Sequence, residues 1–80
     1  MSKEYYKKCL VDLRLKLDRE REAKKHDNAY YTECIKNTSS ASSKASYRKS
    51  KIDKAAYHDS AIEAIRHEIE NTREQMKREK

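Results

Sequence analysis

The sequence predicts an all-α protein: an antiparallel two-helix hairpin of the coiled-coil type, a single unit over residues 1–80 that a partner or self-association completes. The 80-residue chain contains no Gly and no Pro, the residues on which tight turns and strand boundaries most depend, so very few chain reversals are expected. Charged residues make up 42% of the chain, and its Leu and Ile recur at helical spacing. Together these features are typical of long, exposed helices.

The first helix is expected over residues 3–36. Its apolar row follows one helical face and consists of Tyr6, Leu10, Leu13 and Leu17. Continued at the same spacing, the row passes through charged residues before it reaches Tyr31 and Cys34. The middle third of this face is therefore polar. Val11 and Leu15 form a second, shorter apolar line to one side.

A serine-rich segment, residues 37–46, separates the two helical patterns. Its sequence NTSSASSKAS holds six Ser or Thr residues, whose side chains compete with helix by bonding to the nearby backbone. This segment is the predicted turn. Ser42, Ser43 or Ser46 is expected to cap the helix that follows.

The second helix is expected over residues 45–77. Its row has nearly the heptad spacing of a coiled coil and consists of Ile52, Ala55, His58, Ile62, Ile65, Ile69, Thr72 and Met76. Oppositely charged pairs such as Glu70 and Arg73 support the exposed face of this helix. The two rows define the expected helix–helix interface.

A turn centred near residue 43 would fix which residues of the two rows meet. Leu10 then faces Met76 and Cys34 faces Ile52, so the interface closes at both of its ends. A chain this short rarely buries enough apolar area to be stable without a disulfide, a metal or association. A partner is therefore expected on grounds of stability alone.

In this arrangement the middle of the interface is not apolar on both sides, because Ile62 and Ile65 face Lys24 and Glu20. Either the helices separate there and Lys24 extends to solvent, or the isoleucines face another molecule. We interpret the mismatch as a sign that partner helices share the two rows. The predicted partner-binding residues are Leu10, Leu13, Leu17, Ile62, Ile65 and Ile69, together with Tyr6 and Tyr31.

The positive charge gathers at the turn and at the start of the second helix. Residues 36–54 hold six basic residues against one acidic residue, in a chain of formal net charge +6. Such a patch is either a solvated helix end or a contact for phosphates, acidic protein or anionic lipid. No helix-turn-helix, zinc-finger or leucine-zipper pattern favours nucleic acid. The predicted basic patch consists of Lys44, Arg48, Lys49, Lys51 and Lys54.

No set of residues predicts catalysis, a cofactor or a metal site, and the chain is expected not to be an enzyme. Without Gly it has no glycine-rich phosphate loop, and two helices do not readily enclose a pocket. Glu63, His67 and Glu70 share one helix face, but a di-metal site needs such motifs on several facing helices. Cys9 and Cys34 would lie about 37 Å apart along one helix, too far for a disulfide bond.

The amino-terminal segment is charged and lacks the apolar core of a signal peptide, so a cytoplasmic protein is expected. Any export would take place together with a partner. No stretch approaches the ~20 apolar residues that a membrane span requires.

The opening Tyr5-Tyr6-x-x-Cys9-Leu10-x-x-Leu13, followed by charged heptads, resembles the small helical partners encoded beside LXG-type toxins. The hairpin architecture with a central turn resembles the small WXG-type proteins of bacterial type VII secretion. The resemblance implies an adaptor that binds the helical targeting domain of a toxin and accompanies it to the secretion machine. The Trp and Gly of the turn motif that names the WXG family are absent from this chain.

The sequence therefore predicts a protein–protein interaction module, a helical adaptor that binds another helical protein or a second copy of itself. Two alternatives stay open. One is a small basic dimeric hairpin that binds nucleic acid, and the other is a phage- or plasmid-type protein inhibitor.

Overall fold

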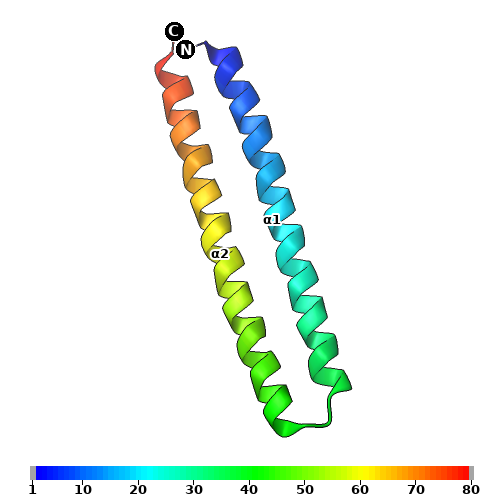
Figure 1. The fold of residues 1–80 in the computed structure, drawn as a ribbon. Helices are drawn as coiled ribbons and strands as arrows, with labels where there is room; N and C mark the ends of the chain where they lie inside the picture. The colour runs from blue at the N-terminus through cyan, green and yellow to red at the C-terminus, as the bar shows by residue number, and fades with distance from the viewer. Residues whose placement is uncertain (1, 80) are drawn as a thin grey trace.

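The computed structural model describes residues 2–79 as two long helices that lie side by side in opposite directions (Figure 1). Helix α1 spans Lys3–Asn37, and helix α2 spans Ala41–Arg78. The hairpin measures 62 × 14 × 11 Å, so it is a rod only two helices thick. The predicted all-α antiparallel hairpin is confirmed.

Helix α1 begins and ends close to the positions predicted from the sequence. Ser2 caps it, and the Ser2 side chain accepts a hydrogen bond from the backbone N–H of Tyr5. The acidic side chain of Glu4 lies in the first turn and the basic side chain of Lys36 in the last, as the helix dipole favours. Thr38 takes an extended conformation and ends the helix.

The turn is shorter than the predicted segment 37–46, and it comprises residues 38–40 alone. Ser40, rather than Ser42, Ser43 or Ser46, caps α2, and its side chain accepts a hydrogen bond from the backbone N–H of Ser43. The prediction was wrong here because one capping serine satisfies the helix start, and serines in the first turns cost little helix stability. No described residue has a positive φ, so this turn does not need Gly.

A small apolar core lies in the half of the hairpin that is nearer the chain ends. It consists of Leu10, Leu17, Ile65 and Ile69, with Leu13, Ile62 and Met76 packed against it. Tyr6 is buried beside the start of α1. No side chain among residues 2–79 is completely enclosed, because each helix has a single neighbour. The remaining faces of both helices meet solvent.

The contacts between the helices differ from the predicted ones at several positions. Lys24, expected opposite Ile62, instead bonds to Asp59 at 2.6 Å. Ile65, expected to face another molecule, is the most buried apolar residue at 4% exposure and contacts the chain's own core. Ile52, expected to meet Cys34, is 68% exposed.

Neither helix of the described chain contains a segment apolar enough over a sufficient length to cross a membrane.

Candidate protein-binding surfaces

A polar layer crosses the helix–helix interface at the middle of the hairpin and consists of His58, Glu20 and Asp27. His58 of α2 is buried at 6% exposure, between two carboxylates that α1 supplies. Its Nδ1 lies 2.6 Å from Glu20 Oε1, and its Nε2 lies 2.5 Å from Asp27 Oδ2. Glu20 and Asp27 are one heptad apart, so both project from the same face of α1. The polar middle of α1, unmatched in the predicted pairing, is therefore matched by a polar residue of α2.

The two carboxylates favour the charged form of His58. Hydrogen bonds to Asp27 and then to Glu20 raise its pKa, and the burial of the ring opposes this more weakly. As an imidazolium the ring donates one N–H to each carboxylate, whereas a neutral ring has a single N–H to donate. Both nitrogens are thereby occupied, which leaves none to bind a metal or to take a proton from a substrate.

Further side chains come from positions next to this layer in the sequence. The Lys24 ammonium donates to the Asp59 carboxylate, so this cation is itself paired. The Tyr57 ring meets the His58 ring edge to face, with centroids 5.5 Å apart. The arrangement is that of a structural polar contact that fixes how the helices pair.

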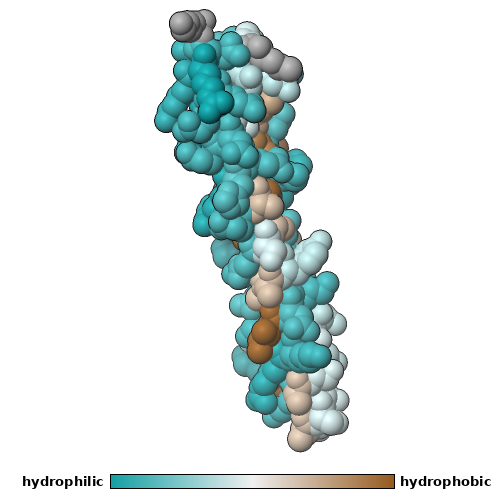
Figure 2. Space-filling model, turned by 90° about the vertical axis from the view of Figure 1, so that its left-hand side faces the viewer, coloured by the Kyte–Doolittle hydropathy of each residue, from teal (hydrophilic) through white to brown (hydrophobic). Residues whose placement is uncertain are grey.

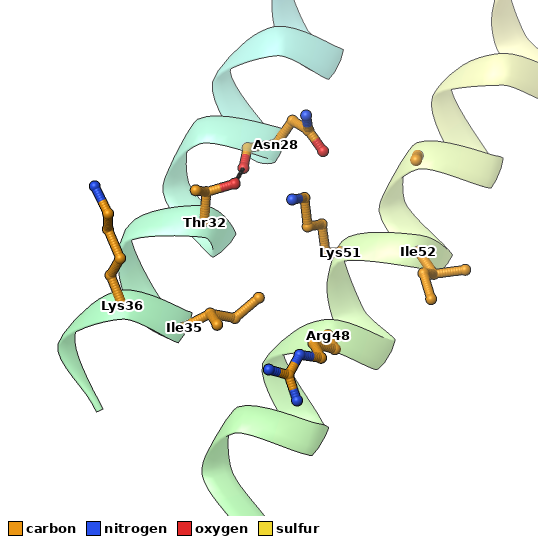
Figure 3. Close-up of a pocket in the computed structure, with 8 residues that line it drawn as sticks. Asn28, Thr32, Ile35, Lys36, Arg48, Lys51 and Ile52 are labelled. Carbon is orange, nitrogen blue, oxygen red and sulfur yellow. Dashed lines mark hydrogen bonds between the residues drawn. The ribbon is translucent and has the colours of Figure 1, made fainter. Parts of the chain in front are cut away.

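A groove opens between the helices in the half that is nearer the turn (Figure 3). We call it the turn-end groove, and its accessible volume is about 540 Å³. Figure 3 shows Ile35 extending from α1 toward α2, and Lys51 and Arg48 extending from α2 toward α1. Its lining residues are Asn28, Thr32, Ile35 and Lys36 of α1, with Arg48, Lys51, Ile52 and Ala55 of α2.

The groove forms because α2 contributes small or flexible side chains to the interface at this level. Where the core half has Ile65 and Ile69, this half has the small Ala55 and the long, flexible Lys51. These side chains do not fill the space between the backbones. Ile35 stays half-buried and Ile52 stays exposed, so the groove has an apolar floor that the chain does not cover.

The rim of the turn-end groove is basic. Arg48 and Lys51 of α2 extend toward α1, whereas Lys36 of α1 contributes to the lining but extends away from α2 (Figure 3). No Asp or Glu is among its lining residues. None of the ion pairs found within residues 2–79 involves Lys36, Arg48 or Lys51. These charges are therefore available to an external anion.

Further apolar surface lies outside the interface. Val11 and Leu15, one turn apart on α1, are 62% and 49% exposed. Tyr30 and Tyr57 are also largely exposed. Figure 2 shows a narrow, interrupted band of apolar residues along a face that is otherwise hydrophilic. A lone chain thus leaves apolar surface near both ends of the rod.

The predicted partner-binding residues lie mainly inside the hairpin. Leu10, Leu17, Ile65, Ile69 and Tyr6 are buried between α1 and α2, and Leu13, Ile62 and Tyr31 are half-buried. The two predicted apolar rows therefore pack against each other instead of against a partner. The exposed surface comes instead from Val11 and Leu15, which the sequence marks as a second apolar line, and from Ile52, which the predicted pairing placed inside.

The predicted basic patch is spread around the first turns of α2. Arg48 and Lys51 lie at the turn-end groove, whereas the Lys54 ammonium lies 6.0 Å from the centre of the Tyr57 ring, away from that groove. Lys44 is half-buried and Lys49 is exposed. The patch therefore does not form one flat basic face, and the groove adds Lys36 of α1, which belongs to the predicted basic region 36–54 but not to the predicted patch.

Two tyrosine pairs have nearly the same local structure. The rings of Tyr5 and Tyr6 lie 5.4 Å apart at 76°, and those of Tyr30 and Tyr31 lie 5.1 Å apart at 75°. The pKa of Tyr5 is raised by a hydrogen bond with the sulfur of Cys9, four residues on. The same arrangement with Cys34 raises the pKa of Tyr30. Both cysteines are free and half-buried.

The face with Glu63, His67 and Glu70 is exposed to solvent, and His67 Nε2 lies 3.5 Å from Glu63 Oε1. No group of three or more potential metal ligands comes together within residues 2–79.

Comparisons with known protein families, with curated proteins and with solved structures give no match.

Proposed function

We propose that this protein is a helical adaptor that binds another helical protein and catalyses no reaction. The observation that carries the proposal is the exposed apolar surface outside the helix–helix interface: Val11 and Leu15 on α1, and Ile52 at the turn-end groove. Burying each such side chain stabilises an assembly by roughly 1.5–3 kcal/mol. A two-helix rod can gain this stabilisation only by packing these side chains against another molecule.

A partner with one or two helices would complete a bundle. Helices in four-helix bundles bury apolar rows against two neighbours, whereas each helix here has one. The long faces of α1 and α2 would supply half of such a bundle. Because the two ends of the rod expose different residues, they can contact different parts of one partner helix.

The finer proposal is that the partner is the helical targeting domain of an LXG-type toxin. It is supported by the opening segment from Tyr5 to Leu13, by the hairpin architecture and by the turn near the middle of the chain. The turn itself is built differently from a Trp- and Gly-containing one, since Ser40 caps the second helix. In this reading the adaptor is made in the cytoplasm and leaves it with the toxin.

The nucleic-acid alternative has weaker support. Its basic patch is distributed around α2, and the cations that do come together surround an apolar floor. Phosphates need no such floor.

The proposal is tested by isolating the tagged protein from its native host, identifying what accompanies it and rebuilding the complex from purified chains. We expect a stoichiometric complex with a helical protein, which Val11→Glu with Leu15→Glu weakens at least tenfold, about 1.4 kcal/mol. Lys16→Glu, on the exposed surface of the same helix, is the matched control and should have a small effect. A purified chain that stays monomeric and a host lysate that yields no reconstitutable complex would contradict the proposal.

A further inference from the structure

We propose that the turn-end groove is the docking site for an amphipathic helix whose apolar ridge is flanked by Asp and Glu. The inference rests on the proposed protein-binding function and specifies one surface and the chemistry of its occupant. It combines three features of the groove: an uncovered apolar floor, a basic rim and a length suited to a short helix.

The floor offers apolar contacts to two successive turns of a helix. Ile35 and Ala55 lie within the groove, and Ile52, at 68% exposure, stands beside them. The α1 side of the groove runs from Asn28 to Lys36, about 12 Å at 1.5 Å per residue. A docked helix would therefore place two apolar residues in it, spaced i and i+3 or i+4, the pattern by which amphipathic helices enter grooves.

The rim selects an acidic occupant. Lys36, Arg48 and Lys51 can lay their aliphatic stems along the floor while their charges stay in water. Carboxylates on both sides of the apolar ridge would then pair with cations from both helices, and Arg48 can bind a carboxylate through two parallel hydrogen bonds. Since no acidic residue lines the groove, these pairs would replace no existing ones.

A second copy of this chain fits the groove poorly. The exposed aliphatic pair on its α1, Val11 and Leu15, lies in residues 7–19, which hold five basic residues and two acidic ones. That segment would bring positive charge to a positive rim. The occupant is therefore a helix from a different protein.

Nucleic acid fits less well than an acidic helix. Single strands are held mainly by stacking of bases on aromatic side chains, and no aromatic residue lines the groove. The exposed Ile52 would have no role in a contact to phosphates, whereas a helix uses both the floor and the rim.

The test measures binding of three labelled helical peptides to the full 80-residue protein by fluorescence anisotropy. The first carries Leu at i and i+4 with Glu on both sides, the second replaces Glu by Lys, and the third replaces Leu by Ser. We expect the first to bind, more weakly as salt increases, and the other two to bind at least tenfold more weakly, about 1.4 kcal/mol. Equal binding of all three peptides, or binding of none, overturns the inference.

Variants of the protein locate the contact. Ile52→Asp should abolish binding of the acidic peptide, and Arg48→Glu should weaken it at least tenfold while strengthening binding of the Lys peptide. Both side chains are exposed, so the circular dichroism of each variant should match that of the parent. Lys49→Glu, which changes charge outside the groove, is the matched control. Unchanged peptide binding by Ile52→Asp would contradict docking here.

The inference and the proposed function fail separately. If the native partner binds through Val11 and Leu15 but ignores Ile52→Asp, the groove assignment is wrong and the adaptor role stands. If the Lys-rich and acidic peptides fail while a labelled oligonucleotide binds through Arg48 and Lys51 independently of Ile52, the groove is a nucleic-acid contact and the inference is wrong.

Discussion

The two halves of this hairpin have the same helices but different interfaces. Near the chain ends, Leu10, Leu17, Ile65 and Ile69 fill the space between α1 and α2. Beyond the polar layer of His58, the interface contains small or charged residues, and the turn-end groove opens. The first half gains its stability from apolar burial within the chain, whereas the second leaves apolar surface uncovered.

The boundary between the halves has a role of its own. Apolar heptad rows gain similar energy when they slide by a turn, so they specify pairing weakly, while a single polar residue in such a row specifies it strongly. His58 satisfies both ring nitrogens only where Glu20 and Asp27 stand on either side of it. Stability and helix pairing therefore come from separate residues. The apolar core stabilises the hairpin, and His58 with its two carboxylates sets the pairing. The turn-end groove contributes to neither.

The largest expected effect tests the division between core and groove. Ile65→Ala removes the most buried apolar side chain and should lower the free energy of unfolding by about 2–4 kcal/mol. Ile52→Ala, the matched change in the other half, should cost less than about 0.5 kcal/mol. Urea unfolding followed by circular dichroism measures both. Equal losses at the two positions would mean that the halves are not distinct.

The next effect concerns the polar layer and depends on pH. The pKa of His58 is raised in the folded state, chiefly by Asp27 and then by Glu20. Because this pKa is raised, protonation of His58 stabilises the fold. The contribution is fully present below the unfolded pKa of 6.5 and is lost as pH rises through the folded pKa. Because both carboxylates are partly exposed, solvent weakens their interaction with the ring. We therefore expect the free energy of unfolding to be only about 1–2 kcal/mol lower at pH 9 than at pH 6.

Replacing the histidine separates this contribution from other titrations. His58→Gln should remove most of the difference between pH 6 and pH 9, measured by the same unfolding experiments. His26→Gln, an exposed histidine on α1, serves as the control and should keep it. A His58→Gln protein with the parent's pH profile would show that the layer does not couple protonation to folding.

The smallest expected effect tests where the turn lies. Ser40→Ala removes the capping oxygen of α2 and should destabilise the hairpin by about 1 kcal/mol. Ser46→Ala, in a position that the serine-rich pattern also offered as a cap, should be neutral or slightly stabilising, because Ala favours helix. Thermal unfolding of the two variants compares them directly. The reverse order would place the start of α2 later in the chain.

Most of the fold could be predicted from the sequence, because heptad rows and the lack of Gly and Pro are strong local signals. The bounds of α1 follow from its pattern almost to the residue. The start of α2 could not be predicted, because serine at a cap and serine inside a first helical turn look alike in composition. The serines of residues 41–46 were interpreted as a loop, and they belong to the helix.

The predicted pairing of the helices also misplaces candidate site residues. It places Ile65 opposite a charged residue and Ile52 opposite Cys34, whereas Ile65 is buried and Ile52 is 68% exposed. His58 was recognised as a member of the heptad row, but its partners could be found only from the correct pairing of the helices. The turn-end groove depends on the same pairing, since Ile35 and Ile52 are distant in sequence and only the fold brings them together.

The start of α1 and the end of α2 lie at the same end of the rod, opposite the turn (Figure 1). A force pulling those ends apart would therefore peel the helices from each other one turn at a time instead of shearing the whole interface at once. The apolar turns around Leu10 and Ile69 would bear the load first, and His58 would be the last strong contact before the two helices separated down to the groove. Tethered by its ends, this molecule would yield early at its best-packed part, and a helix docked in the groove would be released last.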